Sequence, residues 1–254
     1  MGEYFAYDYT RAPFEQLGAA HLGALLVTFL LIVAGWRGRF SVGQRRRLRV
    51  GLAMVILVNE IFWHAWHAAY GLWSVRTLLP LNLCNLMVLC SVYTLLSKKQ
   101  LAYEFTYLLG IPAAVQVLIT PALGQYGFPH ILFFQIFISH GGIIVAALYL
   151  TLGESMRPRS WGAVGRVAGL SILYALFIFG LNQVLGSNYL FLAYKPPAAT
   201  LLDYLGPWPW YFLSMVAIGL ALASLLYLPF WIKDRARLKE ETVELNELKG
   251  TSDE

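Results

Sequence analysis

Long apolar stretches are the feature that most limits how this chain can fold. A helix needs about 20 mostly apolar residues to cross the hydrocarbon core of a bilayer. Only 13% of the residues are charged, whereas soluble domains carry about 25%. The sequence therefore excludes a soluble enzyme and predicts an all-α, polytopic membrane helix bundle. Seven transmembrane helices are expected, at Leu17–Trp36, Val50–Leu72, Pro80–Leu96, Leu101–Leu123, Pro129–Leu152, Gly162–Ser187 and Trp208–Ile232.

Basic residues fall almost entirely on one side of this arrangement. Of the 19 Lys and Arg residues, all except Arg11, Arg76 and Lys195 lie in alternate connectors, just inside the start of the sixth stretch or in the C-terminal tail. Because cytoplasmic loops are enriched in Lys and Arg, we expect the N-terminus outside and the C-terminus inside a cell membrane. The net charge of +5 then concerns orientation. It does not indicate nucleic-acid binding, which needs one basic solvated face with stacking aromatics.

The composition changes sharply after the seventh stretch. Residues 233–254 hold five basic and seven acidic residues. A run of mixed charge is typical of a solvated helix, and a partner-docking role is the alternative. We therefore expect a transmembrane domain at 1–232 and a charged cytoplasmic tail at 233–254.

Polar residues inside the apolar stretches are the candidate functional residues. An ionisable group in hydrocarbon costs about 2.5 to 3.5 kcal/mol on the insertion scale, so it is rarely present without a role. Nearly all of these residues fall in the outer half of the bilayer, which predicts a polar cavity open toward the outer leaflet. Hydrogen bonds between helices are the alternative role. Glu104 lies near the inner surface and is expected to pair with Lys98 or Lys99. The others are Asn59, Glu60, His64, His67, Asn82, Cys84, Asn85, Gln116, Gln135, His140, Asn182 and Gln183.

The second stretch carries the richest cluster. Glu60, His64 and His67 follow i, i+4, i+7 spacing and so share one helical face. This face suits a buried hydrogen-bond network or support for catalysis. Metal ligation is weakly indicated, because no HExxH pattern is present. We expect no metal and no cofactor.

Cys84 is the candidate nucleophile. It stands just after Pro80 and Asn82, near the start of the third stretch, where the positive end of a helix dipole favours a thiolate. The alternative is a small apolar filler. The sequence contains no G-x-S-x-G elbow, Walker A loop or G-x-G-x-x-G turn, which argues against an ordinary serine hydrolase and a nucleotide-binding domain.

Four segments together resemble a known family. LPLNLCNL begins at Leu79, SHGG at Ser139, NYLFLAYKP at Asn188 and GPWPWY at Gly206. In this order they are similar to the YwaF-like, transmembrane-protein-164 family of integral membrane proteins. A more distant similarity is to the androgen-induced-type lipid hydrolases. The chain departs from the commoner LHLC form, because Asn82 stands where that form has histidine.

The resemblance implies acyl transfer between phospholipids or other acyl lipids. Cys84 would be the nucleophile and His140 its base. Asn85, Gln116 and Gln135 would donate to the oxyanion, with Asn182 among the supporting residues, and Lys195 would contact a lipid phosphate. For Lys195, a place in a proline-stiffened connector is the alternative.

The depth of each residue in the bilayer does not decide which histidine is the base for Cys84. At 1.5 Å per residue, Cys84 lies about 6 Å and His140 about 16 Å below the expected outer border, whereas His64 lies at about 10 Å. His64 is therefore a rival base. Two alternative functions also stay open: a lipid-ester hydrolase, and a proton-coupled transporter or channel that uses Glu60, His64, His67 and His140.

Overall fold

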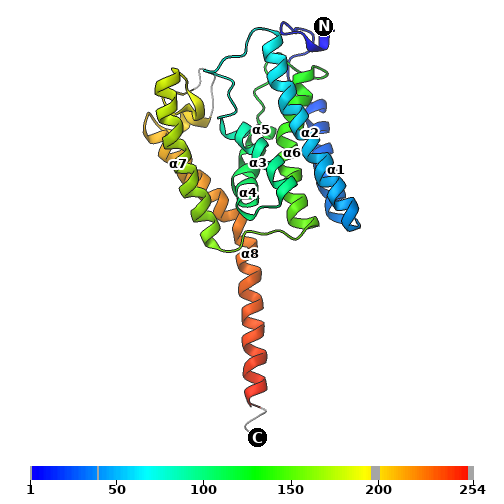
Figure 1. Cartoon of the computed structure of the whole chain (residues 1–254), viewed down its shortest axis with the longest axis vertical. Coiled ribbons are helices and arrows are strands. Elements are labelled where there is room, and N and C mark those ends of the chain that lie inside the picture. The colour runs from blue at the N-terminus through cyan, green and yellow to red at the C-terminus, as the bar shows by residue number, and fades with distance from the viewer. Residues whose placement is uncertain (1, 39, 196–200, 251–254) are drawn as a thin grey trace.

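The computed structural model describes residues 2–38, 40–195 and 201–250 (Figure 1). Arg39 of the first basic connector and Pro196 of the NYLFLAYKP segment lie outside these ranges, as do residues 251–254 of the tail. The described chain is all-α, and its helices join into seven rods. The elements that form the rods are α1 (Ala19–Arg37), α2 (Val42–Ala69), α3 (Leu83–Ser97), α4 (Gln100–Phe105), η2 (Thr106–Gly110), α5 (Ile111–Ile119), α6 (Ile131–Leu148), η3 (Tyr149–Gly153), α7 (Trp161–Leu185) and α8 (Trp210–Gly250).

Six of these rods are long and apolar enough to cross a membrane, which confirms a polytopic membrane protein. The seventh, α3, is shorter. It begins at Leu83 and has 15 residues, so it rises only about 22 Å. Helix was expected from Pro80, but Asn82 is in extended conformation and its Oδ1 accepts the N–H of Leu190. Helix α3 therefore begins three residues later than the sequence predicted.

Helix α6 is the centre of the bundle. It packs against α1, α2, α3 and α5, and its buried face carries large apolar residues such as Phe137 and Ile143. Helices α7 and α8 pack on each other, and they contact the bundle through α4, α5 and η2. In Figure 1 this pair lies on the opposite side of α3–α5 from α1.

Pro112 interrupts the fourth stretch without breaking it. Proline has no N–H to donate within a helix, and the five residues of η2 just before it adopt a π-helical register. The helix then continues as α5 and ends at Ile119, ahead of Pro121. A single π-helical turn thus accommodates the proline without a break in the helix.

Ion pairs tie the helices together at the end of the bundle where the basic connectors lie. The buried carboxylate of Glu154 contacts Arg49 and Lys98 at 2.8 and 2.5 Å. The buried carboxylate of Glu104 accepts hydrogen bonds from Arg166 at 2.8 Å and from Gln100 at 3.0 Å. Arg157 also forms an ion pair with Asp234 of α8.

The predicted pairing of Glu104 with Lys98 or Lys99 is therefore wrong. Helix α4 packs against α7, and this brings Glu104 to Arg166. Lys98 is the C-cap of α3 in the left-handed conformation, with φ of 54°, and it pairs with Glu154 instead.

Arg166→Met should destabilise the protein because it removes the cation from the buried Glu104. A buried group that loses its partner costs about 1–3 kcal/mol, so the midpoint of thermal unfolding in detergent should fall by several degrees. Adding Glu104→Gln should restore part of the loss, and Arg159→Met, at an exposed arginine, is the control. Equal midpoints for Arg166→Met and Arg159→Met would contradict the role of this pair.

Candidate functional site

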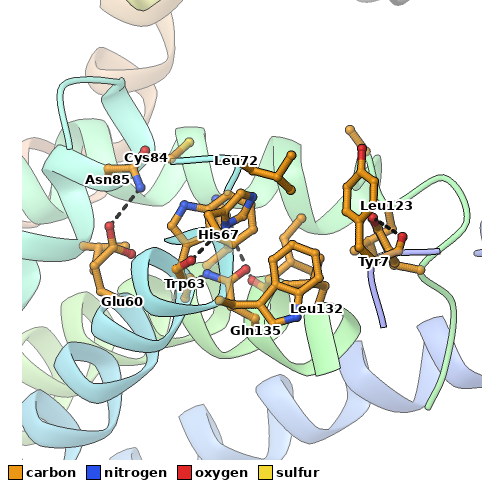
Figure 2. A pocket seen from close by; sticks show the side chains of 17 residues that line it. Tyr7, Glu60, Trp63, His67, Leu72, Cys84, Asn85, Leu123, Leu132 and Gln135 are labelled. Carbon is orange, nitrogen blue, oxygen red and sulfur yellow. Dashed lines mark hydrogen bonds between the residues drawn. The ribbon is translucent and has the colours of Figure 1, made fainter. Parts of the chain in front are cut away.

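A cavity of about 490 Å³ lies among α2, α3, α6 and the connector between α5 and α6 (Figure 2). One part of its wall is apolar and aromatic, with Trp63, Trp66, Leu72, Val88, Ala122, Leu123, Tyr126, Leu132 and Ile136. The other part is polar, with Glu60, His67, Cys84, Asn85, Gln135, Ser139 and His140. The cavity can therefore hold a molecule that has both an apolar part and a polar group.

Cys84 and Asn85 enter the cavity from the first turn of α3. Asn82 is the N-cap of α3, but its side chain accepts no hydrogen bond from the first N–H groups of the helix. Cys84 is half-buried and forms no disulfide. Its thiol thus stands at the positive end of the helix dipole.

Glu60 fixes the side chain of Asn85. The carboxylate is 4% exposed, and its Oε1 accepts a hydrogen bond of 2.9 Å from Asn85 Nδ2 (Figure 2). His64 Nε2 lies 3.5 Å from the same oxygen, and His64 Nδ1 accepts from Trp73 Nε1 at 3.2 Å. Both ring nitrogens of His64 are therefore engaged, and His64 does not line the cavity.

His67 and His140 have the same hydrogen-bonding pattern. His67 Nδ1 lies 2.8 Å from the carbonyl of Trp63, and His140 Nδ1 lies 2.9 Å from that of Ile136. A carbonyl oxygen only accepts, so each Nδ1 carries the proton and donates it. Each Nε2 then keeps a lone pair. Since both rings line the cavity, either can take a proton there.

A buried polar cluster joins α2 to α6 beside His140. Asn59 Nδ2 donates to Ser139 Oγ at 2.7 Å and to the carbonyl of Gln135 at 3.1 Å. Gln135 Nε2 also donates to Ser139 Oγ, at 3.1 Å. Ser139 was not singled out from the sequence. Its place four residues after Gln135, on the same helical face, was the available signal.

The remaining candidate residues lie away from the cavity. Gln116 is exposed on α5. Asn182 accepts from the backbone N–H of Tyr189 and donates to its carbonyl, which holds the connector after α7. Lys195 Nζ lies 5.6 Å from the centre of the Tyr211 ring. Ten residues were given a catalytic, supporting or lipid-contact role from the sequence. The cavity gathers six of them, namely Glu60, His67, Cys84, Asn85, Gln135 and His140.

Glu60, His67, Cys84 and His140 all line the cavity. In the part of the chain that the structure describes, no group of three or more His, Cys, Asp or Glu residues is placed to hold a metal ion.

The segment before α1 covers one side of the cavity, and we call residues 2–18 the N-terminal strap. The carbonyl of Phe5 accepts from Trp66 Nε1 at 2.9 Å and from Tyr70 OH at 2.7 Å. The carbonyl of Tyr7 accepts from Gln125 and Tyr126, and the Tyr7 side chain lines the cavity. No periodicity or motif in the sequence indicates this arrangement.

These features define a polytopic helical membrane protein with a half-polar cavity between its helices. Residues 15–227 match the TMEM164 family, and the chain therefore belongs to this family. No curated protein and no solved structure matches the chain.

Tyr9→Ala should release the N-terminal strap. Tyr9 is 2% exposed, and its ring centre lies 4.8 Å from that of His130, so truncation removes a buried anchor; comparable aromatic-to-Ala changes cost about 3–5 kcal/mol. Trypsin should then cleave after Arg11 faster than in the wild type, as measured by mass spectrometry of timed digests. Tyr9→Phe keeps the ring and should protect the strap, and Tyr4→Ala, at an exposed position, is the control. Unchanged cleavage in Tyr9→Ala would contradict the anchoring role.

Proposed function

We propose that this protein is a membrane-embedded lipid acyltransferase that works through an acyl-cysteine at Cys84. The observation that carries the proposal is the shared cavity. It joins a thiol at a helix N-terminus, two imidazoles with a free Nε2 and an apolar wall. Covalent acyl transfer requires a nucleophile and a base that act at one site, and both kinds of group line this cavity. Membership of the TMEM164 family and the LPLNLCNL and SHGG segments support this reading.

The proposed reaction has two half-steps. His140 Nε2 takes the proton of Cys84, and the thiolate attacks the carbonyl carbon of a phospholipid ester. The tetrahedral intermediate expels the lysolipid alkoxide, which takes the proton from His140, and a thioester is left on Cys84. The hydroxyl of a second lipid then attacks the thioester while His140 removes its proton. The free thiol and a new ester result, and His140 returns its proton to the sulfur.

Asn85 and Gln135 are the proposed amide donors to the oxyanion, since both line the cavity. Glu60 acts by holding Asn85. We propose no chemical role for Gln116, Asn182 or His64, because the first two lie off the cavity and His64 has both nitrogens engaged.

His67 is the competing base. It lines the same cavity and offers the same free Nε2 as His140.

Lys195 lies in a connector, over Tyr211, and we propose it as a phosphate contact outside the cavity. If water replaces the second lipid as acceptor, the same acyl-enzyme gives a lipid hydrolase.

We further propose that the N-terminus faces outward and that the cavity opens toward the outer leaflet of the cell membrane. The basic connectors and the ion pairs of Arg49, Lys98 and Arg166 lie together at one end of the bundle. The tail at 233–254 would then be cytoplasmic, and the positive-inside rule supports this orientation.

The reactivity of Cys84 tests the mechanism. Iodoacetamide should alkylate Cys84 faster than Cys90, whose Sγ donates to the carbonyl of Ala102. Removing a positioned base costs about 10²-fold or more, so His140→Gln should slow Cys84 by about that factor, whereas His67→Gln should have little effect. Peptide mass spectrometry follows both thiols in one sample, with Cys90 as the internal control.

Two results of that experiment would contradict the assignment. A large fall in the Cys84 alkylation rate in His67→Gln, with no fall in His140→Gln, would show that His67 is the base. Equal rates at Cys84 and Cys90 in every variant would remove the nucleophile and favour a transport function for the cavity.

Thiol accessibility in whole cells tests the orientation. In a variant without Cys84 and Cys90, Thr77→Cys should react with a membrane-impermeant maleimide, because its connector is proposed outside. Val42→Cys, at a highly exposed residue at the start of α2, should react only after the cells are lysed. The reverse pattern would invert the orientation.

A further inference from the structure

The geometry points to Ser139 as a hydrogen-bond donor to the carbonyl oxygen of the bound ester. This inference rests on the proposed acyl transfer and adds a substrate-contacting residue to it. Ser139 lines the cavity beside Gln135 and His140, and it is 2% exposed. A serine beside a histidine suggests a nucleophile, but the hydrogen bonds of Ser139 assign it another role.

Both lone pairs of Ser139 Oγ are occupied. Asn59 Nδ2 donates to this oxygen at 2.7 Å and Gln135 Nε2 at 3.1 Å. A hydroxyl oxygen has two acceptor positions and one proton. Nucleophilic attack needs a free lone pair, and these two bonds leave none on Ser139 Oγ. The hydroxyl can therefore act only as a hydrogen-bond donor.

The hydroxyl proton of Ser139 is available to donate into the cavity. A serine in a helix often donates to the carbonyl four residues earlier, which here belongs to Gln135. That carbonyl already accepts the N–H of Ser139 within α6 and Asn59 Nδ2 at 3.1 Å, so both of its acceptor positions are filled. Within the described chain no acceptor is recorded for the Ser139 proton, and the side chain lines the cavity that holds the Cys84 thiol.

Asn59 is the positioning residue for this donor. It is 9% exposed, and its two N–H groups are divided between Ser139 and Gln135. Since α2 supplies Asn59 and α6 supplies the other two residues, the orientation of Ser139 depends on the packing of these helices. A donor fixed before substrate arrives stabilises an oxyanion without reorganisation during the reaction.

Acylation and alkylation of Cys84 distinguish this role from a structural one. Attack on an ester builds negative charge on the carbonyl oxygen, whereas alkylation by iodoacetamide does not. Ser139→Val and Ser139→Thr have nearly the same shape and differ in the hydroxyl, so they form a matched pair. The substrate is p-nitrophenyl butyrate, and the readouts are nitrophenolate release and the mass of the Cys84 peptide in purified full-length protein.

Ser139→Val should acylate Cys84 about 100-fold more slowly than Ser139→Thr, the scale of losing one oxyanion donor. Both variants should react with iodoacetamide at similar rates. Ser91→Ala is the control, because this buried serine donates to the carbonyl of Met87 and does not line the cavity. It should acylate at the wild-type rate. Thermal unfolding of each variant verifies that the compared proteins are folded.

The outcomes separate this inference from the function it rests on. If the wild type acylates Cys84 and Ser139→Val does so as fast as Ser139→Thr, the donor role of Ser139 is overturned and the acyltransferase proposal stands. If the wild type forms no acyl-Cys84, the proposed function is overturned and this inference with it. Acylation of Ser139 itself would show that it is a nucleophile, and that too would overturn the inference.

Discussion

Hydrogen bonds from two adjacent residues of α2 hold the cavity together. Asn59 binds Ser139 and the backbone of α6, while Glu60 binds Asn85 of α3. In a bilayer a polar group without a partner costs several kcal/mol, so these groups strongly favour the one arrangement that pairs them. Three helices are thereby fixed around a common space. Every candidate role proposed within the cavity depends on that placement.

The hydrogen bonds that the polar groups of the cavity already make determine which of these groups can react. His67 and His140 each use Nδ1 on their own helix and leave Nε2 for a proton. His64 uses both nitrogens. Glu60 holds the side chain of Asn85, whereas Cys84 is a free thiol in the first turn of α3. The residues with unused capacity are therefore the ones able to react.

The apolar lengths of the sequence predicted an all-α membrane bundle, because a helix that spans hydrocarbon needs about 20 apolar residues. Six of the seven expected spans are long enough, whereas α3 is shorter than predicted. The clustering of polar residues in the outer half predicted a polar cavity, and Cys84, Asn85, Glu60 and His140 line one. Spacing along one helix does not determine which neighbour that helix faces, so the exposure of Gln116 and the pairing of Glu104 were not predictable. The depth count separated Cys84 from His140, yet both line one cavity. Ser139 and the N-terminal strap depend on contacts between distant segments, and local patterns carry no signal for these.

The most direct test of the account is the mass of Cys84 after contact with a lipid substrate. Purified protein would be reconstituted into liposomes of phosphatidylcholine with isotopically labelled acyl chains, quenched in acid and digested. The account predicts a labelled acyl group on the Cys84 peptide that hydroxylamine removes, as expected for a thioester, and that Cys84→Ala lacks. Acyl transfer between lipids that persists in Cys84→Ala, with no labelled adduct in the wild type, would contradict it.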